Sequence, residues 1–265
     1  MRHIYAILAD KTMPDKTDSF KKLVVQTFLR VPRTIFFSRA IMNLIRGNFY
    51  ALRKKTAQKE HEFQQGSALW GKAILKKTKT DMRVVNDIQA PGSGHFIFLN
   101  HVNEMDFAFD CLLLQKPFLA NQVIKQTYVA YWWMRAMGSE VFDRSNKRTI
   151  AKSVKSLLKG LKKNSYIVYP EGSNTYSEEI IPLKKGMINL SYKLKIPIVL
   201  ILKSGITKFQ EKPQNNTIAY KSCGIIKPDS FASWEEFRDH LYQVMVEEKK
   251  KLDEEIKSFA NQQSS

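Results

Sequence analysis

The sequence predicts an α/β fold, in which a mixed central sheet is flanked by helices and follows an N-terminal amphipathic helical region. Beyond residue 90, short apolar runs alternate with helical patterns, as in sheets that helices cover on both faces. Hydrophobic residues make up 43% of the 265 residues, which is enough for a substantial core. Before residue 60, apolar residues are interspersed with Lys and Arg. We therefore expect a helical region over residues 1–80 and an α/β domain with a C-terminal helix over residues 81–265.

The N-terminal pattern over residues 17–56 is both basic and apolar. Pro32 is expected to divide it into two helices, because proline interrupts the hydrogen bonds inside a helix. Apolar faces mixed with Lys and Arg suit a helix that lies among lipid headgroups, so we expect residues 1–80 to associate with a membrane. The alternative is a helix packed on the core with its basic face in water. A further helix is expected over residues 60–77.

The elements of the α/β domain follow from the apolar runs and their lengths. Strands are expected over residues 95–99, 119–124, 165–169, 197–202 and 217–226. Helices are expected over residues 107–114, 128–137, 148–162, 184–194 and 234–259. Ser233 is the expected N-cap of the last helix, and Glu235 and Glu236 suit its first turn.

The charge balance limits the classes of partner. Lys and Arg number 43 against 25 Asp and Glu, giving a net charge of +18, which calls for an anionic partner. Nucleic acid is not expected, since the sequence has no zinc-finger, RNP-type or basic-zipper pattern. Cys111 and Cys223 lie far apart, so no zinc or redox motif is indicated. No apolar run is long enough to span a bilayer, and no secretory signal pattern is present.

His101 and Asp106 are the leading candidates for catalysis. Residues five apart in a straight helix point about 140° away from each other, so the two side chains can meet only across a turn. They do so if His101 ends the strand over residues 95–99 and Asp106 opens the next helix. Asp106 would then hold one imidazole nitrogen, and the other could take a proton from a hydroxyl. Alternatively, Asp106 is an ordinary N-cap and His101 a satisfied turn residue.

A metal at this position is not expected. His101, Glu104 and Asp106 could contribute ligands, but the sequence nearby supplies no second histidine and no cysteine. A serine acyl-enzyme is not expected either, because the nucleophile motif Gly-x-Ser-x-Gly does not occur.

Two further motifs suit anion binding. Arg144 follows a short strand-like run, where a guanidinium can fork onto a phosphate; the alternative is a surface ion pair with Asp143 or a contact with a helix. Glu171 and Gly172 follow the expected strand over residues 165–169. The glycine permits close approach, and backbone amides there could bind an anion, although a plain tight turn would have the same sequence.

In this order, the motifs resemble those of the glycerolipid acyltransferases, the lysophosphatidate acyltransferase family with its His-x4-Asp motif. The resemblance covers roughly residues 83–205. The matching positions are Asn100, His101, Asp106, Gly138, Asp143, Arg144 and Pro170-Glu171-Gly172, and Lys125 is similar to a lysine between the family's first and second blocks.

The resemblance implies roles for these residues. His101 would be the general base and Asp106 would orient it, while Arg144, Glu171 and Gly172 would bind the phosphorylated acceptor. Lys125 would also bind substrate, and Lys184 and Lys185 are weaker candidates for phosphate contact. The reaction implied is fatty acyl transfer from acyl-CoA or acyl carrier protein to a lysophospholipid hydroxyl in phospholipid synthesis. The acceptor implied first is 1-acyl-glycerol-3-phosphate, and no cofactor or metal is implied.

One departure from the family pattern bears on the acceptor. The third block usually reads Glu-Gly-Thr-Arg, and here Asn174 stands in place of the arginine. A different lysolipid acceptor is therefore an alternative, and so is a non-catalytic membrane-binding scaffold. Because the basic charge suits anionic headgroups, we expect a peripheral or monotopic protein on the cytoplasmic face of a membrane.

Overall fold

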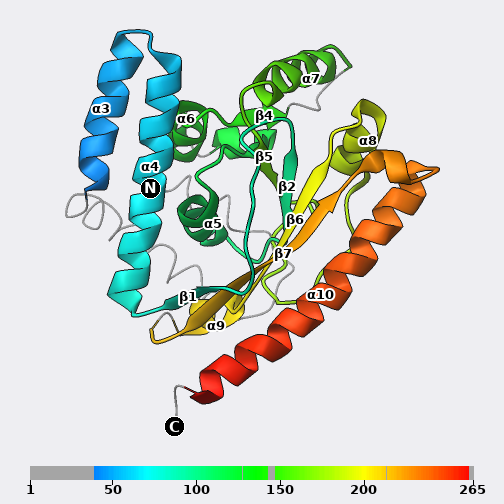
Figure 1. The fold of residues 1–265 in the computed structure, drawn as a ribbon. Helices are drawn as coiled ribbons and strands as arrows, with labels where there is room; N and C mark the ends of the chain where they lie inside the picture. The colour runs from blue at the N-terminus through cyan, green and yellow to red at the C-terminus, as the bar shows by residue number, and fades with distance from the viewer. Residues whose placement is uncertain (1–38, 127, 143–146, 213, 263–265) are drawn as a thin grey trace.

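The computed structural model describes residues 39–126, 128–142, 147–212 and 214–262, and its centre is a five-stranded mixed sheet (Figure 1). The strand order is β1-β7-β6-β2-β5; β7 runs antiparallel to β6, and the other neighbours are parallel. The strands are β1 (Asp81–Val84), β2 (Phe96–Leu99), β5 (Tyr166–Val168), β6 (Ile198–Ser204) and β7 (Thr217–Ile226). A separate parallel pair is formed by β3 (Leu119–Asn121) and β4 (Glu140–Phe142). The predicted mixed sheet flanked by helices is confirmed.

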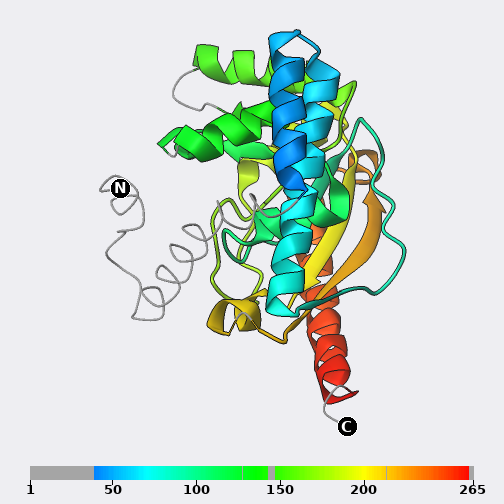
Figure 2. The ribbon, with the colours of Figure 1, turned by 90° about the vertical axis from the view of Figure 1, so that its left-hand side faces the viewer.

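Helices surround the sheet in the predicted alternation with strands (Figures 1 and 2). They are α3 (Ala40–Leu52), α4 (Thr56–Thr78), α5 (Asp106–Leu114), α6 (Tyr128–Ala136), α7 (Lys147–Leu161), α8 (Lys185–Leu194), α9 (Ile206–Glu211) and α10 (Trp234–Gln262), with the 3₁₀ helices η1 (Gln122–Gln126) and η2 (Pro228–Ser230). The proposed break at Pro32 lies outside the described residues.

Four of the five predicted strands are found within two residues of their expected ends. The strand predicted over residues 119–124 is too long, because β3 ends at Asn121 and the chain continues as η1. Among the described residues, the ladder partner of β3 is the three-residue strand β4, in which Phe142 lies opposite Asn121. Past Asn121 the chain forms the 3₁₀ helix η1 over Gln122–Gln126, in which backbone groups can bond locally.

The hairpin of α3 and α4 lies along the left-hand side of the molecule in Figure 1 and faces the viewer in Figure 2. On α4, the Glu62 carboxylate accepts a hydrogen bond from Asn43 of α3 at 2.7 Å and pairs with Arg46 at 3.2 Å. Trp70 and Ile74 of α4 are buried in the same cluster as residues of the sheet and α5. The described part of the N-terminal helical region thus shares its core with the α/β domain.

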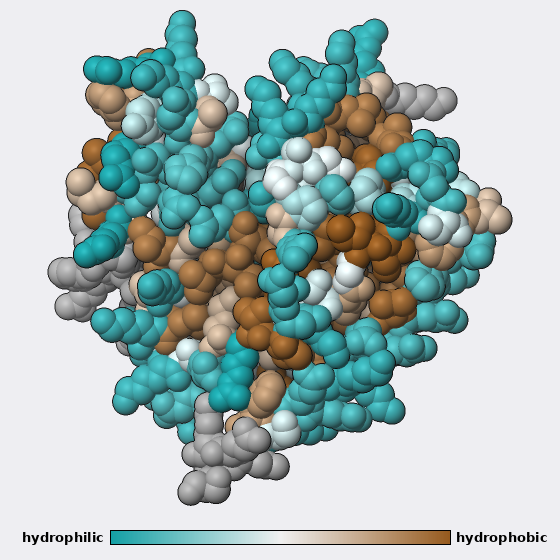
Figure 3. Space-filling view, viewed as in Figure 1, coloured by the Kyte–Doolittle hydropathy of each residue, from teal (hydrophilic) through white to brown (hydrophobic). Residues whose placement is uncertain are grey.

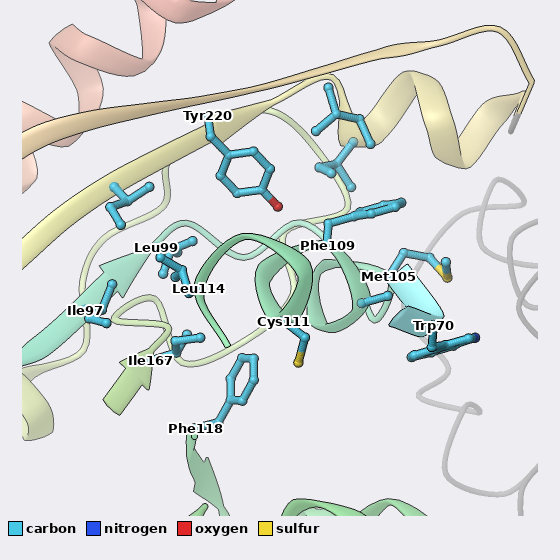
Figure 4. Packing of buried hydrophobic residues seen from close by; sticks show 14 of the residues in the cluster. Trp70, Ile97, Leu99, Met105, Phe109, Cys111, Leu114, Phe118, Ile167 and Tyr220 are labelled. Carbon is cyan, nitrogen blue, oxygen red and sulfur yellow. The ribbon is translucent and has the colours of Figure 1, made fainter. Parts of the chain in front are cut away.

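Two apolar clusters cover the two faces of the sheet. One contains α4, α5 and α6 residues, and the other contains residues of α7, α8 and α10. Figure 4 shows the first cluster around α5, with Phe109, Cys111 and Leu114 pointing to neighbouring elements. At Gly71, a Cβ atom would lie 2.2 Å from the Ala108 carbonyl oxygen, so α4 and α5 approach more closely than any larger residue allows.

The last helix begins as predicted. The Ser233 hydroxyl accepts a hydrogen bond from the Glu236 amide at 3.1 Å, and the Glu236 carboxylate accepts one from the Ala232 amide at 2.9 Å. The first bond satisfies an amide that the first turn of a helix leaves open, and the second ties the residue before the N-cap to that turn.

The surface is polar at its periphery, and apolar residues gather over α5 and the strands between α4 and α10 (Figure 3). Among the described helices, none combines the length with the hydropathy that crossing a bilayer requires.

Candidate active site

The loop between β2 and α5 holds the leading candidates, and Asn100 fixes where that loop starts. β2 pairs with β6 up to Leu99, opposite Ile201. Asn100 then continues the pairing with its side chain: the amide group donates to the Lys203 carbonyl at 3.1 Å and accepts from the Lys203 amide at 2.9 Å. His101 is therefore held at the carboxyl end of β2, next to β6.

The expected contact between His101 and Asp106 is present. His101 Nδ1 lies 2.7 Å from Asp106 Oδ2, and the Val102 and Asn103 amides donate to the same oxygen at 2.7 and 3.2 Å. Asp106 opens α5, but the N-cap position belongs to Met105, so the carboxylate does not cap its own helix. It turns back onto the loop and fixes both the ring and the backbone beside it.

Asp106 is fully buried, and its surroundings favour the charged form of its carboxyl group. Burial alone would raise the pKa of this carboxyl group, but the charge of Lys203 and the hydrogen bond from His101 outweigh it and hold the pKa below its usual value. The His101 side chain keeps 17% of its surface exposed. The buried carboxylate thus faces inward, and the imidazole reaches the surface.

Lys203 and Asp110 form a buried ion pair behind Asp106, which was not predicted from the sequence. Lys203 Nζ lies 2.7 Å from Asp110 Oδ2 and 3.3 Å from Asp106 Oδ2, and all three side chains are fully buried. The signals were a lysine directly after the apolar run over residues 197–202 and an aspartate inside the apolar helix over residues 107–114. Neither signal shows by itself that the two residues meet.

Tyr169 contacts both this ion pair and His101. Its ring stacks on the His101 imidazole with centroids 3.9 Å apart and an interplanar angle of 8°. The Tyr169 hydroxyl donates to Asp110 at 2.6 Å, and the Tyr220 hydroxyl donates to the other Asp110 oxygen at 2.8 Å. Burial raises the pKa of Tyr169 well above its usual value, and the charge of Asp110 raises it further, so the hydroxyl stays a donor.

Glu171 contacts the backbone of His101 from the other side. Its carboxylate is fully buried and accepts a hydrogen bond from the His101 amide at 2.6 Å. Burial raises the pKa of this group to about 7. Gly172 follows with a positive φ of 72°, and a Cβ atom there would lie 2.8 Å from Lys184 Cγ. The Glu171-Gly172 turn therefore packs against the backbone of His101.

Asn174 lies beside the same loop. Its side-chain amide donates to Glu104 Oε1 at 2.8 Å and to the Tyr176 hydroxyl at 3.1 Å, and that hydroxyl donates to Glu104 Oε1 at 2.8 Å. The second oxygen of Glu104 is buried and has no hydrogen-bond partner among the described residues. The Thr175 amide donates to the His101 carbonyl at 3.0 Å, which joins the two loops.

The remaining candidates lie in different surroundings. Lys125 is exposed on η1. Lys185 begins α8, and its ammonium lies 4.7 Å from the centre of the Trp234 ring at the start of α10. The Lys184 amide donates to the Pro170 carbonyl at 2.8 Å, close to the Glu-Gly turn. Arg144 lies outside the described residues. The structure therefore brings together His101, Asp106, Glu171 and Gly172.

This arrangement suits proton transfer at the surface. With the proton of Nδ1 donated to Asp106, the lone pair of His101 is at Nε2, where it can accept a proton from a hydroxyl group. In the part of the chain that the structure describes, His, Cys, Asp and Glu form no cluster that could hold a metal ion.

Comparison with known proteins adds a family and a fold. Residues 81–202 match the Acyltransferase family. A 1-acyl-sn-glycerol-3-phosphate acyltransferase of Cocos nucifera is 31% identical over 112 residues, which are 39% of this chain and 35% of that protein. The provisionally named 1-acyl-sn-glycerol-3-phosphate acyltransferase acl-1 of Caenorhabditis elegans is 27% identical over 174 residues, which are 61% of this chain and 64% of that protein. The matches thus span about a third and about two thirds of these relatives.

The crystal structure of the 1-acyl-sn-glycerophosphate acyltransferase PlsC from Thermotoga maritima has a similar fold. It aligns with a TM-score of 0.65 at 17% identity, covering 84% of this chain and 95% of that one. At this identity, the likeness concerns the fold.

Proposed function

We propose, from the match of residues 81–202 to the Acyltransferase family, that this protein transfers a fatty acyl group from an acyl thioester to the hydroxyl of a lysophospholipid. The donor is acyl-CoA or acyl carrier protein, and the first candidate acceptor is 1-acyl-glycerol-3-phosphate, since both relatives carry that name. The observation that carries the proposal is the 2.7 Å contact between His101 and Asp106 at the end of β2.

The proposed step uses His101 as a general base. Nε2 takes the proton of the acceptor hydroxyl while the oxygen attacks the thioester carbonyl carbon. The C–O bond of the new ester forms, the C–S bond breaks, and the leaving thiolate receives the proton from the imidazolium. Asp106 keeps the ring in place and offsets the positive charge that it gains, because the carboxylate is buried and ionised.

We assign acceptor binding to Arg144 and to the backbone at Gly172, with Lys125 and Lys185 as further contacts. The positive φ of Gly172 turns the chain directly after Glu171, whose carboxylate bonds the His101 amide. An acceptor phosphate at this turn would lie beside the base. Glu171 itself is fully buried, so its contribution would be to hold this turn against His101. Lys185 would have to leave the Trp234 ring to reach a phosphate.

We place the protein on the cytoplasmic face of a membrane, bound peripherally or monotopically to anionic lipid. The support for membrane contact is the outer face of α3, where Ile45, Phe49 and Leu52 are exposed, Leu52 to 85%. Arg46 is on the same helix, and Arg53 follows it with its guanidinium 4.2 Å from the centre of the Phe49 ring. Apolar side chains that can insert, next to guanidinium groups that attract anionic headgroups, suit an interfacial helix.

A second candidate acceptor is a lysophospholipid whose headgroup carries an amine or hydroxyl groups. The observation that favours it is the Glu104 carboxylate beside Asn174, with one buried oxygen that lacks a partner among the described residues. A carboxylate repels a bare phosphate but accepts hydrogen bonds from an ammonium or hydroxyl group. Asn174 supplies no charge to reverse that preference.

The test is release of free thiol from acyl-CoA by the purified full chain. The acceptor is varied among lysophosphatidate, lysophosphatidylethanolamine and lysophosphatidylglycerol with the same acyl chain. We expect release that depends on the lysolipid and falls by about 10²–10⁴-fold in His101→Ala, the range that a positioned base supplies. Release that is unchanged in His101→Ala would overturn the mechanism.

The same assay separates the alternatives. Preference for lysophosphatidate supports the first acceptor, whereas preference for the ethanolamine or glycerol headgroup supports the second. If acyl-CoA gives no release with any acceptor, acyl carrier protein is loaded as the donor. No release with either donor would favour a scaffold that binds membranes without catalysis.

A further inference from the structure

Lys203 is an unusual residue for its position. It lies near the end of β6, between Leu202 and Ser204, and every residue of that strand is buried. Lysine is almost never fully buried unless it is paired, because its ammonium loses the solvation of water. Its side chain therefore needs partners inside the protein, and both of its anionic partners belong to α5.

The first partner connects Lys203 to the candidate base directly. Its ammonium lies 3.3 Å from Asp106 Oδ2, the same oxygen that contacts His101 Nδ1. Burial by itself would raise the pKa of Asp106, and the lysine charge is the largest influence that opposes this. Lys203 thus favours the ionised form of the carboxylate that orients the imidazole.

The second partner connects Lys203 to the other side of the ring. Asp110 accepts bonds from Lys203 at 2.7 Å, from Tyr169 at 2.6 Å and from Tyr220 at 2.8 Å. Tyr169 lies flat against His101, and the Lys203 ammonium is 4.9 Å from the centre of the Tyr169 ring. The imidazole is therefore held at its edge by Asp106 and at its face by Tyr169, and both holders contact the same buried pair.

The charges of this network balance when the imidazole gains a proton. With both carboxylates ionised, they and the one ammonium give a net charge of −1 next to neutral His101, and the imidazolium brings the sum to zero. Burial raises the pKa of Asp110, and the charge of Lys203 opposes that rise and favours the ionised form. The other groups that face the network are Glu171 on the His101 amide, the two tyrosine hydroxyls and the buried thiol of Cys111. These are neutral as protonated groups, apart from Glu171, whose pKa is raised to about 7.

We propose that Lys203 and Asp110 are positioning residues for the acyl transfer proposed above: together they keep Asp106 ionised and oriented on His101, and they set the charge against which His101 takes up its proton. The proposal rests on that function. A role in stability alone would not explain the arrangement well, because a buried ion pair is often no more stabilising than apolar residues of similar size.

The test uses Lys203→Met, Asp110→Asn and the double variant in the full chain. Lys203→Met removes the cation, so we expect kcat to fall at least about tenfold and the acid limb of the kcat–pH profile to move to higher pH. Asp110→Asn removes an anion, so its acid limb should move to lower pH. The double variant restores the net charge of −1 and should bring the acid limb back towards the wild-type position.

Lys249→Met is the matched control. Lys249 is 3% exposed and pairs with Glu178 at 2.9 Å and with Asp253, and neither partner bonds to His101, Asp106 or Asp110. We expect this variant to lower the melting temperature without moving the pH profile. If Lys203→Met does not fold, Asp110→Asn and Tyr220→Phe still test the network, since Tyr220→Phe removes one donor from Asp110.

The outcomes separate this inference from the proposed function. If wild type is active, His101→Ala is inactive, and the Lys203 and Asp110 variants change only the melting temperature, the pair is structural and the inference is wrong. If the wild type releases no thiol with either donor, the proposed function fails first. Opposite shifts of the two single variants, cancelled in the double variant, support the inference.

Discussion

The imidazole of His101 lies parallel to the ring of Tyr169, with centroids 3.9 Å apart. The two residues come from the ends of neighbouring strands, since His101 follows β2 and Tyr169 follows β5. The stack restricts rotation of the imidazole about its side-chain bonds, while the Asp106 contact restricts tilting in the plane of the ring. The Tyr169 ring on the face of the imidazole and the Asp106 carboxylate at its edge thus define the direction in which Nε2 points.

This relationship makes a prediction about Tyr169. Tyr169→Leu removes the ring, and stacked aromatic pairs are worth about 0.5–1.5 kcal/mol, so we expect kcat to fall roughly two- to tenfold. Tyr169→Phe keeps the ring and removes the donor to Asp110, so kcat should change less, and the free energy of unfolding should fall by about 1 kcal/mol. Steady-state kinetics and urea unfolding check both. Equal kcat values for the two variants would mean that the stack does not orient the histidine.

Glu171 predicts a pH dependence of stability. Its pKa in the folded protein is about 7, above the ordinary value of 4.5, so the folded state retains a proton that the unfolded state releases between these values. The contribution to stability is full below pH 4.5 and declines as the pH rises to 7, by roughly 3 kcal/mol at most, since each pH unit is worth about 1.4 kcal/mol.

Glu171→Gln isolates this effect, because the amide oxygen can still accept the His101 amide bond. We expect the variant to lose the decline, so that it gains stability relative to wild type between pH 5 and pH 7.5 in urea unfolding. Parallel stability curves for the two proteins would show that Glu171 does not carry the proton.

The conformation of Gly172 predicts that adding a side chain there lowers both stability and activity. Its φ of +72° disfavours residues with a Cβ atom, and that atom would lie 2.8 Å from Lys184 Cγ. We expect Gly172→Ala to lower the free energy of unfolding by about 1–2 kcal/mol and to lower activity as well, because the turn contacts the His101 backbone through Glu171. Gly92→Ala is the control, since a Cβ atom there would meet nothing within 4 Å. Similar losses in both variants would contradict the prediction.

The exposed face of α3 predicts membrane binding. Ile45→Ser with Phe49→Ser removes two exposed apolar side chains, so we expect weaker sedimentation with vesicles that contain anionic lipid. The wild type should bind less at high salt, because screening weakens the attraction of Arg46 and Arg53. Val246→Ser on α10 is the control, as Val246 is also an exposed apolar residue on a helix. Undiminished binding of the α3 variant would place the membrane contact elsewhere.

The sequence allowed the His101–Asp106 contact to be predicted because it is local. The apolar run that ends at Leu99 and the helix that starts at Asp106 leave only a short turn between them. The Lys203–Asp110 pair joins residues 93 positions apart and depends on β6 lying next to β2. Sheet order is set by the packing of the whole domain, and a single run of apolar residues does not encode it.

The short edge strand β1 could not be predicted from the sequence for a related reason. In β1, Asp81 and Arg83 interrupt the apolar pattern, yet the strand forms because it pairs with β7 from Asp81 to Val84. The α/β layering, by contrast, followed from alternating elements that each carried a strong pattern. Local signals thus predicted the layers, and tertiary contacts decided the edges and the partners of buried charges.

The close approach at Gly71 gives α4 a mechanical role. Its 23 residues extend about 35 Å at 1.5 Å per residue. One end is joined to α3 through Asn43 and Glu62, and its middle touches α5, the helix that begins with Asp106. Through these two contacts, α4 acts as a rigid spacer that fixes the distance between α3 and His101. When α3 rests on a surface, this distance sets how deep into that surface the histidine can reach. A longer or shorter α4 would change that depth.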